Sequence, residues 1–103
     1  MMTEFEVESE KHDRIYRVLV DIYTDEEWEL EEMWWVNSPF SAMDDHGILC
    51  FQKIAHERYY INTDEASYEV DTNTAYAFME DIEDELQEQI SEHYMRQARR
   101  FNY

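Results

Sequence analysis

Acidic side chains recur at every fourth position near the C-terminal end of the chain, at Glu80, Asp84, Glu88 and Glu92. On an α-helix this spacing stacks the carboxylates along one side, so that the four form a row roughly 18 Å long. Each pair of like charges four residues apart destabilises a helix by a few tenths of a kcal/mol. No Lys or Arg balances the row, because none occurs from position 59 to position 95. Such a row is suited to attracting a positively charged partner rather than to catalysis.

Further acids surround this row and recur in other segments. Asp81 and Glu85 flank it, and Glu29, Glu31 and Glu32 belong to the acidic run DEEWELEE at positions 25–32. One interpretation is an ordinary solvated helix face, since acids near a helix N-terminus complement the helix dipole. The recurrence of the bias outside the helix, also in glutamates at positions 4, 6, 8 and 10, favours a second interpretation. In it, the row of four, the flanking Asp81 and Glu85, and the acids Glu29, Glu31 and Glu32 bind a basic partner.

The overall charge supports a folded protein with a basic partner. The 103 residues carry 26 acidic and 8 basic side chains, which gives a net charge of −18. A disordered acidic tail would be poor in aromatic residues, whereas aromatics make up 16% of this chain. A net charge of this size disfavours direct binding to nucleic acid or to an anionic membrane. We therefore expect a single domain at 1–103, a monomer or homodimer, that presents its charge on the folded body.

The residues that usually build catalytic and metal sites do not form a recognisable motif. Asp44, Asp45 and His46, with Cys50 and His56 nearby, lack the close paired spacing of zinc ligands. The four histidines show no nucleophile arrangement, and we predict no enzyme activity, no metal and no cofactor. Cys50 is the only cysteine, which fits a reducing compartment. With neither a signal peptide at the start nor a long apolar run, we expect a cytoplasmic protein in the host cell.

The elements that position these residues indicate an α+β fold. Alternating or β-branched and aromatic patterns predict strands at 3–9, 14–23, 48–54 and 58–62, with a possible extension at 67–70. From about Thr74 to Arg100, apolar residues recur every three or four positions, which predicts a long amphipathic helix. Thr72, Asn73 or Thr74 can cap its start. We expect an antiparallel meander of about four to five strands, packed by one long C-terminal helix.

Residues 24–36 fit two structures. Thr24 followed by Glu27 fits a capping box at the start of a short helix. An alternative is a strand that follows a turn, and this is the interpretation we prefer. It rests on four apolar residues at even positions, which would share one face of a strand: Trp28, Leu30, Trp34 and Val36. In a strand, one of the adjacent Trp34 and Trp35 faces outward. Most strand aromatics belong to cores, but we predict that Trp35, next to Glu31 and Glu32, contacts the partner.

In size, net charge, acidic stripes and aromatic content, the chain resembles the small acidic DNA-mimic inhibitors encoded by phages and mobile elements. These include antirestriction and anti-CRISPR proteins. The resemblance covers the whole chain but rests on no shared motif, so it assigns no residue. It implies that the protein occupies the nucleic-acid groove of a host protein, such as a CRISPR or restriction effector. The charge is compatible with this, because −18 equals the charge of roughly 30 Å of duplex DNA. The alternative is an acidic adaptor or assembly factor that binds a basic surface without competing with nucleic acid.

Overall fold

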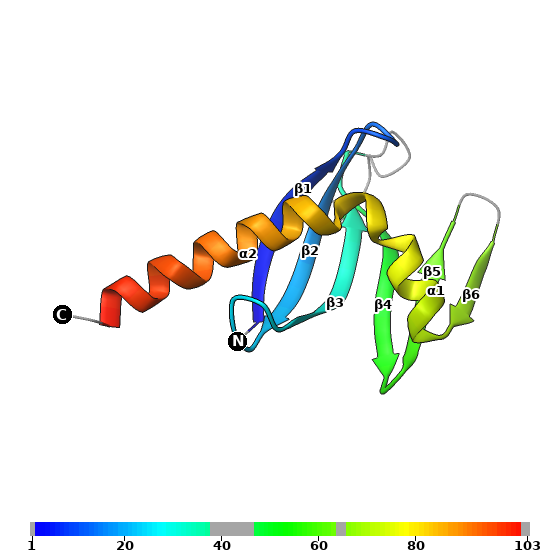
Figure 1. The fold of residues 1–103 in the computed structure, drawn as a ribbon. Coiled ribbons are helices and arrows are strands. Elements are labelled where there is room, and N and C mark those ends of the chain that lie inside the picture. Colours follow the sequence, from blue (N-terminus) through cyan, green and yellow to red (C-terminus); the bar gives the residue numbers. More distant parts are fainter. Residues whose placement is uncertain (1, 38–46, 64–65, 102–103) are drawn as a thin grey trace.

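The protein is built on one antiparallel sheet of six strands that follow one another in chain order (Figure 1). The computed structural model describes residues 2–37, 47–63 and 66–101, with side chains as far as residue 97. The sequence predicted four to five strands, and the sixth comes from the short segment at the second edge. The strands are β1 (Met2–Ser9), β2 (Arg14–Ile22), β3 (Trp28–Trp35), β4 (Ile48–Ala55), β5 (Arg58–Asn62) and β6 (Ser67–Val70).

The sheet has one buried face, as the alternating pattern of its strands requires. In β2, for example, Tyr16, Val18, Val20 and Ile22 are buried, and the residues between them are only partly buried. Their partners in the neighbouring strands continue the same face, and two helices cover it. The core therefore lies between a single sheet and a single layer of helices.

A β-bulge in β3 changes which tryptophan faces the core. Leu19 pairs with Glu32 and Val20 pairs with Leu30, so that Glu31 is an extra residue in the ladder. The prediction that Trp34 shares a face with Trp28 and Leu30 is therefore wrong, because the bulge lies between them. Trp35 packs against the core, and Trp34 lies on the opposite face of the sheet. The strand itself, preferred over a helix for this segment, is confirmed.

The C-terminal region forms two helices rather than the predicted one. The short α1 (Thr72–Phe78) ends at Met79, and α2 (Glu80–Phe101) continues for 22 residues. The helix N-cap is Asp71, whose carboxylate accepts the backbone N–H of Thr74, and not one of the three residues predicted for this role. α1 packs on β5 and α2 packs mainly on β1, at opposite ends of the sheet. Because a twisted sheet presents these ends in different directions, the chain turns at the buried Met79.

The long helix crosses the sheet and projects beyond it. In Figure 1, α2 passes over β3, β2 and β1, and its C-terminal end extends past the β1 edge. The inner side of α2 buries Ile82, Leu86 and Ile90, so its acids lie on the remaining sides. Within the described ranges, no helix has both the length and the apolar character needed to cross a membrane.

Candidate partner-binding surface

The outer side of α2 presents three acids without a partner. Glu80, Asp84 and Glu88 are exposed, and none of them forms a hydrogen bond or ion pair with another described residue. Glu92, the fourth member of the row, lies 2.6 Å from the guanidinium of Arg96. Because both side chains are more than half exposed, this pair is weak and does not remove the negative field of the row.

Asp81 and Glu85 have a different role, because they join α2 to β1. Asp81 accepts a hydrogen bond from the hydroxyl of the buried Ser9, and its side chain is only 18% exposed. Glu85 accepts the backbone N–H of Glu8 at 3.1 Å. The sequence predicted both acids as partner-binding residues, and the structure places them at the joint between helix and sheet.

This joint brings the glutamates of β1 beside the acids of α2. The amide of Gln89 donates to the backbone oxygen of Glu6 at 2.9 Å, one helical turn beyond the contact between Glu85 and Glu8. A shallow hollow in the same region is lined by acids of both elements, including Glu8, Glu10 and Asp84. We call the combined surface the acidic edge, and it consists of Glu4, Glu6, Glu8, Glu10, Glu80, Asp84, Glu88 and Glu92.

The same side chains of α2 protect the open edge of the sheet. An edge strand exposes backbone groups that can pair with a strand of another chain. In β1, the N–H of Glu8 and the C=O of Glu6 are taken by Glu85 and Gln89. The β1 edge is therefore covered by helix side chains at its centre, which favours side-chain contacts over strand addition there.

On its other side, α2 lies against the turn between β2 and β3. The side-chain oxygen of Gln87 accepts the indole N–H of Trp28 at 2.6 Å, and its amide donates to the backbone oxygen of Asp25 at 2.7 Å. This contact holds the acidic turn containing Glu26 and Glu27 next to the helix. The run DEEWELEE is thus divided, with its first acids beside α2 and its later acids within the sheet.

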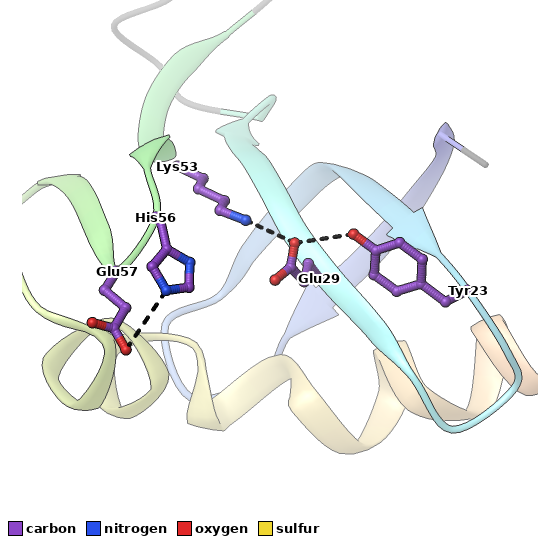
Figure 2. Close-up of polar contacts among 5 residues, drawn as sticks. All are labelled: Tyr23, Glu29, Lys53, His56 and Glu57. Atoms are coloured by element: carbon purple, nitrogen blue, oxygen red, sulfur yellow. Dashed lines mark hydrogen bonds and ion pairs between the residues drawn. The ribbon is translucent and has the colours of Figure 1, made fainter.

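The later acids, predicted as part of the same site, are not brought together with those of α2. Glu29 lies 2.7 Å from the Nζ of Lys53 and accepts the hydroxyl of Tyr23 at 3.3 Å (Figure 2). The hydrogen bond from Lys53 holds the pKa of Glu29 below its ordinary value. Partial burial raises the pKa of Glu31, while Lys53 opposes this shift. Glu29 is thus neutralised within the protein and contributes little to attraction at long range.

The remaining predicted contact residues of β3 also have internal partners. Glu32 accepts the indole N–H of Trp34 at 3.2 Å and the amide of Gln52 at 3.5 Å. Trp35, predicted to face outward, packs on the core, and the guanidinium of Arg14 lies 3.8 Å from the centre of its ring. Its indole donates to Asn37 at 2.7 Å. The outward tryptophan is Trp34, because the bulge shifts the parity of the strand.

The acidic edge can attract cations through its exposed carboxylates. Its described basic neighbours are Lys11, His12 and Arg96. The sequence predicted the α2 row but did not include the β1 glutamates in the site. Their alternation showed that they share one side of a strand, but not that this strand lies under α2. No protein-family model, curated protein or solved structure matches the chain.

Proposed function

We propose that the protein is an acidic mimic of nucleic acid, which occupies the basic nucleic-acid-binding groove of a host defence protein such as a CRISPR or restriction effector. The observation that carries this proposal is the acidic edge. Glu80, Asp84 and Glu88 are exposed without cationic partners in the described structure, and the glutamates of β1 lie next to them. A basic groove that normally binds phosphates offers complementary charge to such a surface.

The spacing within the acidic edge supports the proposal. Residues two apart in a strand are separated by roughly 6.6 Å, and residues four apart in a helix rise about 6 Å. β1 and α2 therefore present two rows of carboxylates with a similar repeat. Duplex DNA also presents two rows of negative charge, with a phosphate every 3.4 Å or so of axis on each strand. The carboxylate rows are sparser, and the other acids of the body add to their field.

The proposal is tested by reversing charge at two matched positions. Glu88 lies on the acidic edge, and Glu57 lies on the turn between β4 and β5, at the other end of the sheet (Figure 2). Both are exposed, so E88K and E57K change the net charge equally without disturbing the core. The wild-type protein and both variants are immobilised, and partners are captured from host lysate at low salt. We expect E88K to reduce capture about tenfold and E57K to leave it nearly unchanged, because local charge controls the contact.

A captured protein supports the proposal only if it is itself a nucleic-acid-binding protein that loses its nucleic acid when this protein is added. Equal loss of capture in E88K and E57K would show that only net charge matters, and would contradict a defined binding surface. Equal retention in both would remove α2 from the interface.

A further inference from the structure

The sheet face opposite the helices is uncovered in the described structure and has its own chemical character. Because directly paired residues share a face, the register defines two rows across it. Glu4, Leu19, Glu32, Gln52 and Tyr60 form one row through five strands. In the second row, Trp34 pairs with Arg17 on one side and Leu49 on the other. Both helices lie on the other side of the sheet (Figure 1).

The two rows enclose a hollow of about 290 Å³, lined by Glu4, Arg17, Leu19, Glu32 and Trp34. Leu19 and Trp34 supply an apolar floor and wall, and both are partly buried. Glu4 and Glu32 place carboxylates on two strands around it, and Arg17 supplies one positive charge at the rim. The hollow is thus an aromatic and apolar recess with a surplus of negative charge.

Glu32 is held in place by neutral groups. The indole of Trp34 and the amide of Gln52 each donate to one of its oxygens, and no described cation lies within ion-pair distance of it. The orientation of this carboxylate is therefore fixed before any partner arrives. Pre-organisation of this kind lowers the entropy lost when a charged group binds.

We propose that the uncovered sheet face is a second protein-binding surface, and that its hollow accepts an arginine side chain of a basic protein partner. A guanidinium matches the indole and the carboxylates of the hollow, since it can stack on an indole ring and form hydrogen bonds to a carboxylate, and the two glutamates outweigh the single charge of Arg17. The neighbouring strands already contain one such stack, between Arg14 and Trp35 on the other face. The inference rests on Glu32, Leu19 and Trp34, which lie outside the acidic edge, although Glu4 belongs to both surfaces.

Charge favours a basic partner over a second copy of this chain. In a symmetric dimer through this face, Glu4 and Glu32 of one copy would meet the same patch of the other. Each copy also carries a net charge of −18. Like charges placed against each other in an interface cost several kcal/mol.

The test uses the three tryptophans as separate reporters. A capped tetra-arginine peptide is titrated into the ¹⁵N-labelled full chain, and the indole N–H signals are followed by NMR. We expect a saturable shift of the Trp34 signal, whereas the indoles of Trp28 and Trp35, bonded to Gln87 and Asn37, remain in place. E32Q is expected to weaken the binding seen at Trp34 about tenfold, because a charge-assisted contact is lost. L19K, which adds a second cation to the hollow beside Arg17, is expected to abolish it.

E88Q is the matched control, since it removes the same charge from the helix side of the molecule. It is expected to change the binding seen at Trp34 by less than about twofold, because separated surface charges are screened by salt. Shifts confined to α2 amides, or equal effects of E32Q and E88Q, would overturn the inference and leave the proposed function intact. A Trp34 shift that depends on protein concentration without peptide would assign the face to a second copy, and would also overturn it.

Discussion

At the residue scale, the acids of α2 divide into those that face solvent and those that hold the fold. Asp81 belongs to the second group, because its carboxylate accepts the hydroxyl of Ser9, which is fully buried. The Ser9 hydroxyl in turn accepts the backbone N–H of His12 at 3.3 Å. This chain of contacts fixes the start of α2 to the end of β1. A substitution of Asp81 would therefore change the stability of the fold as well as any binding, so it is not suited to testing the binding surface.

We predict that Ser9→Ala lowers the free energy of unfolding by about 1–3 kcal/mol, because it leaves the partly buried Asp81 carboxylate without its donor. Urea denaturation measures the change. Ser67→Ala is the matched control, since the Ser67 hydroxyl donates to Asn62 at an exposed site, and we expect a change within about 0.5 kcal/mol. Equal changes in the two variants would show that the contact between Ser9 and Asp81 is not a joint of the fold.

Gly47 is the second residue with a defined structural role. Its φ is +86°, and a Cβ there would lie 2.4 Å from the backbone oxygen of Trp35. Gly47→Ala is therefore expected to destabilise the protein by roughly 1–3 kcal/mol, through the strained conformation and the close contact. Thermal unfolding measures this, and an unchanged melting temperature would contradict the close approach of this segment to the end of β3.

At the element scale, the acidic edge is a property of α2 and β1 together. The sequence predicted five of the six strands within a few residues, correctly favoured a strand at 28–35, and offered the segment of β6 only as a possible extension. It could not show the bulge at Glu31, because one extra residue in a ladder depends on the pairing with β2. That residue exchanges the faces of Trp34 and Trp35. The helical periodicity runs through Met79 without a break, so the turn between α1 and α2 comes from packing on the two ends of the sheet.

The ion pair at the end of the α2 row gives a prediction about this element. Arg96→Gln removes the partner of Glu92, and the unfolding free energy is expected to change by less than about 0.5 kcal/mol, as for other exposed pairs on helices. The association rate with a basic partner should increase, because the row gains one unit of negative field. Stopped-flow or surface-plasmon-resonance kinetics measure the rate. A slower association would contradict the participation of this end of α2.

At the scale of the whole molecule, the dominant property is self-repulsion among carboxylates. Among the described residues, ion pairs are few, and those of Glu29, Glu69 and Glu92 leave most acids without a cation. Salt screens repulsion between exposed charges, over about 8 Å at physiological ionic strength. We therefore expect the melting temperature to rise from low to moderate salt, as measured by circular dichroism. A flat or falling melting temperature would show that the acids are not crowded.

The pH dependence of stability follows from two glutamates of β3. The pKa of Glu31 is raised by burial, so the stability that its protonation provides is complete below the ordinary glutamate value near 4.3 and is lost as pH rises through the raised pKa. The pKa of Glu29 is lowered by Lys53, so its contribution is complete above the ordinary value near 4.3 and is lost below it. The melting temperature should therefore increase as pH falls from neutral toward the ordinary glutamate value near 4.3, and decrease as pH falls further below it. Scanning calorimetry across this range measures it. A steady decrease from neutral pH would contradict the assignment of Glu31, and a continued increase at the lowest pH would contradict the assignment of Glu29.

The most direct test of the central claim is competition between this protein and duplex nucleic acid for the captured partner. The partner is held at constant concentration with this protein in fluorescent form, and unlabelled duplex DNA or guide RNA is added while polarisation is followed. Imitation of nucleic acid predicts that the competitor displaces this protein completely. The apparent affinity of this protein for the partner should fall in proportion to the concentration of the nucleic acid. A ternary complex that persists at saturating nucleic acid would contradict it and would identify the protein as an adaptor.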